Sequence, residues 1–118
     1  MTANRGDVAI ALLPHSTGSA SKPRPVLVEQ SDVYNLQMRI LVVAAITTNL
    51  KHASDSASVL IDIATAEGKA SGRLQNSLVS CVNLATIDES LVAKTIGQLP
   101  ASLMQRVNAG LKVALALP

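Results

Sequence analysis

The sequence has almost no aromatic residues. Its 118 positions include one tyrosine and neither phenylalanine nor tryptophan. Modules of the RRM and OB types stack bases on aromatic rings, so this scarcity argues against both. Hydrophobic residues still make up 48% of the chain and charged residues 15%. We therefore expect one domain over residues 1–118, with a core of Val, Leu, Ile and Ala.

Cysteine, histidine, net charge and long apolar runs are also scarce. A lone cysteine, Cys81, indicates a reducing compartment, and two histidines at unrelated positions argue against a zinc site. The net charge of +2 excludes a strongly basic nucleic-acid-coating protein but permits a local basic site. The longest apolar run, residues 40–46, is far shorter than the roughly 20 residues that cross a bilayer, and no signal-peptide pattern is present. We expect a cytoplasmic protein that does not bind membranes.

Short apolar segments with strand-like patterns dominate the chain. The segment at residues 38–46 is apolar on both faces, so it is predicted to be a central strand. The polar residues 14–23 are predicted to be a loop. Five or six strands are predicted in all, from candidate segments at residues 7–13, 24–29, 38–46, 57–63, 78–84 and 94–99.

Helical signals are fewer. Residues 31–35 predict a capped helical turn, residues 67–73 a plain turn, and residues 86–89 the start of a helix. From residue 101 a C-terminal helix is predicted, whose apolar stripe packs on the core and consists of Met104, Val107, Leu111 and Leu115. The strands are too closely spaced for regular helical crossovers. The fold class is therefore mainly β with added helices (α+β), as a small barrel of mostly antiparallel strands.

Four segments stand in a characteristic order. They are RGDV at residues 5–8, KPRPVLV at 22–28, AITT at 45–48, and NLATID at 83–88 followed by KTIGQL at 94–99. Together they resemble the MazF/PemK (also called Kid) family of toxin endoribonucleases from type II toxin–antitoxin systems. The resemblance covers essentially the whole chain.

This resemblance implies an SH3-like barrel of five to seven strands that forms a homodimer. It implies ribosome-independent, sequence-specific cleavage of single-stranded RNA, including mRNA, with neither metal nor other cofactor. The ribose 2′-OH would attack the adjacent phosphate and leave a 2′,3′-cyclic phosphate and a 5′-OH. A cognate antitoxin would fill the RNA groove, and double-stranded DNA would be bound only through that antitoxin.

The resemblance also assigns catalytic roles to two residues. Arg24 falls on the family's catalytic arginine, and a guanidinium is suited to clamping a phosphate. Thr47 falls on the threonine at the end of the family's central strand, where its hydroxyl can bond a phosphate oxygen or the 2′-OH. The alternatives are a solvated surface arginine and a threonine that merely suits a strand.

The sequence departs from the family at Ala85, where many relatives carry an arginine, and at Asn83, which replaces the usual glutamine. No general base is identified. His15 is the nearest candidate by its ordinary pKa, and Arg73 is a candidate for the missing positive charge. The full set of further candidates for catalysis or substrate binding is His15, Ser19, Lys22, Thr48, Asn49, Arg73, Asn83 and Thr86.

Two other functions remain open at this point. The missing arginine at Ala85 permits a catalytically weak or inactive toxin-like binding module on the same fold, held by its antitoxin. A gyrase poison of the CcdB type is a version of this, although such poisons rely on a C-terminal Trp that this chain lacks. A structural dimer without a substrate is the third possibility.

Overall fold

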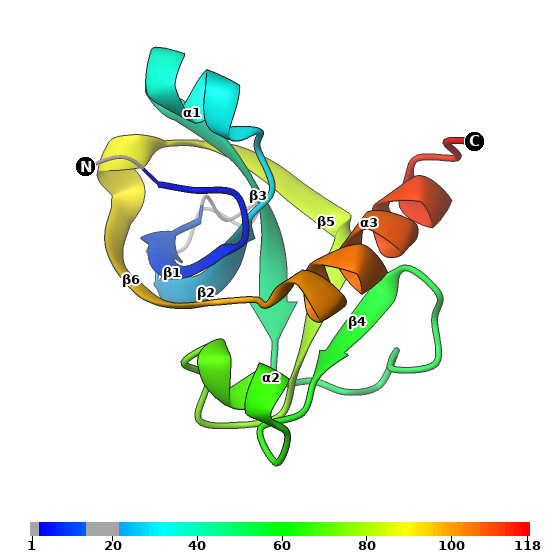
Figure 1. Ribbon diagram of the computed structural model, residues 1–118. Coiled ribbons are helices and arrows are strands. Elements are labelled where there is room, and N and C mark those ends of the chain that lie inside the picture. Colours follow the sequence, from blue (N-terminus) through cyan, green and yellow to red (C-terminus); the bar gives the residue numbers. More distant parts are fainter. Residues whose placement is uncertain (1–2, 14–21) are drawn as a thin grey trace.

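The computed structural model describes residues 3–13 and 22–118, and these form one curled sheet with added helices (Figure 1). The strands are β1 (Asp7–Leu12), β2 (Pro23–Val28), β3 (Ile40–Thr47), β4 (Ser58–Ile61), β5 (Ser77–Asp88) and β6 (Val92–Gln98). The helices are α1 (Asp32–Gln37), α2 (Ala66–Ala70), the 3-10 turn η1 (Glu89–Leu91) and α3 (Ala101–Ala114).

The six strands lie in the order β4-β5-β3-β2-β1-β6, and every neighbouring pair is antiparallel. The sheet curls into a half-barrel, with α1 and α2 at opposite ends of the molecule and α3 beside β4 and β5 (Figure 1). β3 has a partner on each side, as predicted for the central strand. The mainly β fold with a C-terminal helix is confirmed.

β5 contains a bulge that shapes one end of the barrel. Ala44 of β3 pairs with Leu84, whereas the next residue, Ala45, pairs with Ser80. Residues 81–83 of β5 therefore have no partner on β3, and the Cys81 amide instead donates to the carbonyl of Ala57 over 2.9 Å. A bulge bends its strand and changes the direction of its side chains.

The core is aliphatic, as the composition predicts, and lies on both faces of the sheet. One cluster, under α3, includes Leu27, Ala44, Leu103 and Val107. The other, inside the curl, includes Val26, Val28, Leu41 and Val43. Successive residues of β2 and β3 thus point into different clusters, which explains why both strands are apolar on both faces.

Three local predictions were wrong. Residues 67–73 are not only a turn, because α2 begins at Ala66, where the Thr65 hydroxyl accepts a hydrogen bond from the Gly68 amide over 3.0 Å. Residues 86–88 continue β5 through pairing with β3, and only the short η1 follows, capped by Asp88. Leu115 lies beyond α3 and is exposed.

Candidate active site

A pocket of about 690 Å³ opens where β2 begins, β3 ends and β5 bulges, at the end of the molecule that carries α2. Five of the residues predicted from the sequence to form the site line this pocket, although they come from four separate segments of the chain. The described lining residues are Leu13, Arg24, Pro25, Ala45, Ile46, Thr47, Thr48, Arg73, Asn83, Leu84 and Ala85.

The pairing of β2 with β3 brings Arg24 and Thr47 to one rim of this pocket. The last ladder pair toward the pocket is Val26 with Ala45. The same register, continued outward by two residues, places Arg24 opposite Thr47. Side chains opposite each other on antiparallel strands have Cβ atoms about 5 Å apart. Both residues are exposed and line the same pocket, so one ligand can contact a guanidinium and a hydroxyl there.

The Thr47 hydroxyl is held by the turn that follows β3. Its Oγ1 accepts a hydrogen bond from the Asn49 amide over 3.1 Å, which leaves the hydroxyl hydrogen available to donate to a ligand. The side chain of Asn49 in turn accepts from the Lys51 amide over 3.0 Å. Asn49 therefore closes the turn and does not line the pocket among the described residues.

The bulge in β5 delivers Asn83 to the pocket. Asn83 is the last of the three residues without a partner on β3, and its amide is exposed at the pocket wall beside Ala85. Thr86 is paired with Val42 and lies outside the pocket lining. Lys22 is exposed just before β2 and also lies outside the described lining. The predictions for His15 and Ser19 fall outside the described residues.

The sequence did not indicate the apolar wall of the pocket. Besides Ala85, five lining residues carry no polar side chain, and they come from β2, β3 and β5 and from the residue after β1. The sequence predicts these residues as parts of strands and assigns none of them to the site, because strand alternation does not mark which apolar residue borders a cavity. These residues are Leu13, Pro25, Ala45, Ile46 and Leu84.

The electrostatics of the pocket favour an anion. Two of its described lining residues, Arg24 and Arg73, are cationic and none is acidic. Over residues 3–13 and 22–118, no group of three or more His, Cys, Asp or Glu side chains could hold a metal ion. The pocket is therefore suited to phosphate bound through guanidinium and hydroxyl groups.

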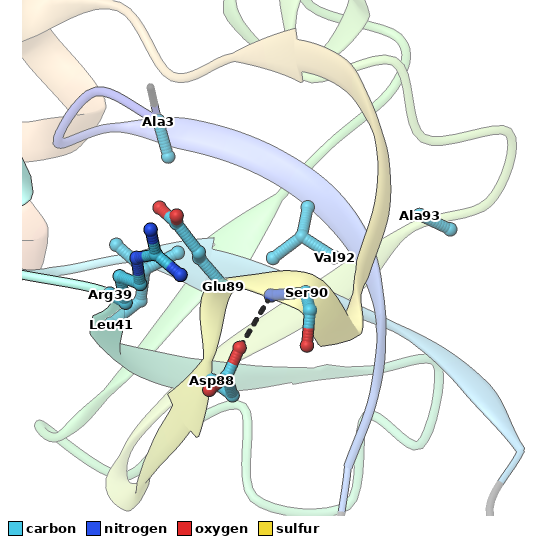
Figure 2. A pocket seen from close by; sticks show the side chains of 8 residues that line it. All are labelled: Ala3, Arg39, Leu41, Asp88, Glu89, Ser90, Val92 and Ala93. Carbon is cyan, nitrogen blue, oxygen red and sulfur yellow. Dashed lines mark hydrogen bonds between the residues drawn. The ribbon is translucent and has the colours of Figure 1, made fainter. Parts of the chain in front are cut away.

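A second pocket, of about 540 Å³, lies at the other end of β3 (Figure 2). Its lining combines Arg39 with two carboxylates, Asp88 and Glu89. The pKa of Asp88 is lowered, chiefly because its carboxylate accepts a hydrogen bond from Ser90, so it is ionised at neutral pH. Two carboxylates in one lining repel a polyanion, and this pocket is a poor site for a nucleic-acid backbone.

The described part of the chain contains no helix that is both long enough and apolar enough to span a bilayer.

The comparisons with known proteins agree with this geometry. Residues 4–115 match the family of the PemK-like, MazF-like toxin of type II toxin-antitoxin systems. Endoribonuclease MazF6 of Mycobacterium tuberculosis is 35% identical over 120 residues, which cover 99% of this chain and 100% of that protein. Two solved structures have the same fold, each with a TM-score of 0.78.

The first is the Mycobacterium tuberculosis toxin MazF-mt6, 28% identical, with 95% of this chain and 98% of that chain covered. The second is an endoribonuclease from a mycobacterial species in complex with its cognate antitoxin, 20% identical, with 98% and 97% covered. On the extent of the family match and the identity to MazF6, the chain belongs to the PemK/MazF family of toxin endoribonucleases.

Proposed function

We propose that this MazF-type toxin endoribonuclease cleaves single-stranded RNA in the pocket between β2, β3 and β5. The observation that carries the proposal is the convergence of Arg24, Thr47, Thr48 and Asn83 on one cavity without an acidic lining residue among those described. Family membership supports RNA cleavage as the reaction, and the lining of this cavity supports it as the site where the RNA binds.

The chemistry follows from what these side chains offer. The ribose 2′-OH gives up its proton as its oxygen attacks the adjacent phosphorus, the bond from phosphorus to the 5′ oxygen breaks, and that leaving oxygen takes up one proton, so no net proton is gained or lost. The products are a 2′,3′-cyclic phosphate and a 5′-OH. Arg24 stabilises the negative charge that builds up on the non-bridging oxygens, since its guanidinium is permanently charged. The Thr47 hydroxyl donates a hydrogen bond to one of those oxygens.

The proposal assigns no general base. None of the described lining residues is a histidine, aspartate or glutamate. His15 stays a prediction from the sequence.

The partners that we propose for this protein are those of its family. We propose a homodimer in the cytoplasm whose RNA groove is closed by a cognate antitoxin, as supported by the mycobacterial endoribonuclease solved with its own antitoxin. Double-stranded DNA would be bound only through the antitoxin. With a net charge of only +2 per chain, a groove shared by two protomers gains contacts that one protomer lacks.

The test uses purified protein and a mixture of single-stranded RNAs, with EDTA present to suppress metal-dependent nucleases. We expect discrete fragments ending in a 2′,3′-cyclic phosphate and a 5′-OH. A 2′-deoxynucleotide at the cleaved position should block cleavage there, because it removes the attacking oxygen. RNA that stays intact at high protein concentration, or cleavage that survives the 2′-deoxy substitution, contradicts the proposal.

A further inference from the structure

Arg73 enters the same pocket as Arg24 from a segment 49 positions further along the chain, the loop between α2 and β5. The side chain is half-buried, unlike the exposed Arg24. Two cationic side chains in one lining, with no acidic lining residue among those described, favour an anionic ligand there.

The Arg73 side chain is fixed by one hydrogen bond. Its Nε donates to the hydroxyl of Ser77 over 3.1 Å, and that hydroxyl donates in turn to the carbonyl of Gln75 over 2.8 Å. Ser77 is fully buried at the start of β5. Within the described residues no carboxylate pairs with Arg73, so the rest of its guanidinium is available to a ligand in the pocket.

The backbone that carries Arg73 is also held tightly. The Arg73 amide donates to the hydroxyl of the fully buried Ser71 over 3.1 Å. Gly72 has a φ of +76°, and a Cβ at this position would stand 2.1 Å from the carbonyl oxygen of Ile96 in β6. At Gly97 a Cβ would stand 2.4 Å from the carbonyl oxygen of Ala70. The loop thus lies directly on the β6 backbone, and Arg73 projects from a rigid support.

We infer that Arg73 binds a phosphate of the RNA backbone next to Arg24, and that Ser77 is the positioning residue that aims its guanidinium. The inference rests on the proposed function, because the ligand is the RNA of that reaction. A guanidinium whose Nε is already bonded keeps its two Nη groups for a phosphate, which a lysine in the same place could not reproduce with the same geometry.

The first experiment compares Arg73→Gln with Lys69→Gln, a matched loss of one exposed positive charge on α2, outside the described pocket lining. We expect Arg73→Gln to lower kcat/KM for RNA cleavage about 10- to 100-fold. It should also reduce the slope of log affinity against log salt by about 0.7, the value for one phosphate contact with a single strand. Lys69→Gln should change neither quantity.

The second experiment separates binding of the phosphate from positioning of the side chain. Ser77→Ala removes the hydrogen bond but keeps the charge, so we expect the salt slope to stay and kcat to fall. Arg73→Lys keeps the positive charge, so its salt slope should be close to that of the natural chain, whereas its kcat should stay close to the reduced value of Arg73→Gln. Circular dichroism melting of each variant identifies any that is unfolded. Should Ser77→Ala itself unfold, Arg73→Lys and Arg73→Gln still test the role of Arg73.

Three results overturn the inference. They are an unchanged salt slope in Arg73→Gln, an unchanged kcat/KM in that variant, and an equal effect of Lys69→Gln. Arg24→Ala, measured in parallel, tests the proposed function separately. If Arg24→Ala slows cleavage and Arg73→Gln does not, this inference fails while the proposed function stands. If Arg24→Ala cleaves normally, the proposed function fails as well.

Discussion

The Nη2 atom of Arg5 lies 3.4 Å from Oε1 of Glu29, and Oε2 of the same carboxylate is buried without a hydrogen-bond partner among the described residues. Arg5 also donates to the Glu29 carbonyl over 2.8 Å and to Asn108 of α3 over 2.8 Å. Burial raises the pKa of Glu29 to about 7, against the opposing effect of the Arg5 charge.

The buried Cys81 thiol also has a raised pKa, of about 11, because of its burial and, to a smaller extent, the Glu29 charge. This thiol is therefore not an ionised nucleophile at neutral pH.

The first prediction concerns stability against pH. Between pH 4.5, the ordinary pKa of Glu29, and about 7, the folded protein binds more protons at this residue than the unfolded chain does. Its contribution to the free energy of unfolding is therefore largest at the acidic end of this range and falls as pH rises, by up to about 3 kcal/mol. Glu29→Gln cannot ionise and should lose this dependence.

Urea unfolding of both proteins at pH 5 and pH 8 measures the effect. The free energy of unfolding of the variant, relative to the natural chain, should rise between the two pH values. A difference that is the same at both values would show that Glu29 is not buried as a neutral acid.

The second prediction concerns the contact of α3 with β5. A Cβ at Gly110 would stand 2.9 Å from the Cys81 Sγ, which is buried and cannot move away easily. We expect Gly110→Ala to destabilise the protein by about 1–2 kcal/mol, although alanine favours a helix over glycine by about 1 kcal/mol. In a Cys81→Ala background, where the sulfur is absent, the same substitution should stabilise. A double-mutant cycle by thermal or urea unfolding checks this, and equal effects in both backgrounds refute it.

The third prediction concerns a buried pair of amide side chains, Gln30 just before α1 and Asn35 within it. The Gln30 side chain donates to Asn35 Oδ1 over 2.9 Å and to the Ile40 carbonyl over 2.8 Å, and Asn35 donates to the Gln30 carbonyl over 2.9 Å. Asn35→Leu leaves buried polar groups of Gln30 without partners and should cost about 1–3 kcal/mol of unfolding free energy. Gln37→Leu, an exposed position on the same helix, should change it by less than about 0.5 kcal/mol. A loss of the same size in both variants would contradict this account.

The fourth prediction concerns Thr47. Thr47→Val keeps the branched shape that suits the end of β3 and removes the hydroxyl, so RNA cleavage should slow about 10- to 100-fold. Thr47→Ser keeps the hydroxyl, so its rate of RNA cleavage should stay within a few fold of the natural rate. Thr95→Val, which removes an exposed hydroxyl from β6, is the control and should cleave at the natural rate. If Thr47→Val also cleaves at that rate, the hydroxyl has no part in the reaction.

Most of the strands could be predicted because alternation of apolar residues is a local property of the chain. Residues 38–46 are apolar on both faces, and β3 is indeed central with a core cluster on each side. The sequence does not predict α2, because Gly68 within the helix and Gly72 just after it indicate a turn, whereas the Thr65 cap that starts the helix is a single hydrogen bond.

The site was predictable only in part. Arg24 and Thr47 stand at the ends of predicted strands, and their meeting follows once those strands pair. The bulge that delivers Asn83 was not visible, because residues 81–83 have the composition of ordinary strand. The approach of Arg73 depends on the close contact of Gly72 with Ile96, 24 positions later, and on the buried hydroxyl of Ser77. A contact between residues as distant in the chain as Gly72 and Ile96 leaves no local signal.

The central claim is that the pocket at the meeting of β2, β3 and β5 is where RNA is cut. Its most direct test is the single-turnover rate of cleavage of one single-stranded RNA by Arg24→Ala and by Arg39→Ala, purified in the same way. Arg39 is an exposed arginine that lines the other pocket. We predict a rate at least about 100-fold lower for Arg24→Ala and within about twofold of the natural chain for Arg39→Ala. Cleavage by Arg24→Ala at the natural rate, or an equal loss in Arg39→Ala, would contradict the claim.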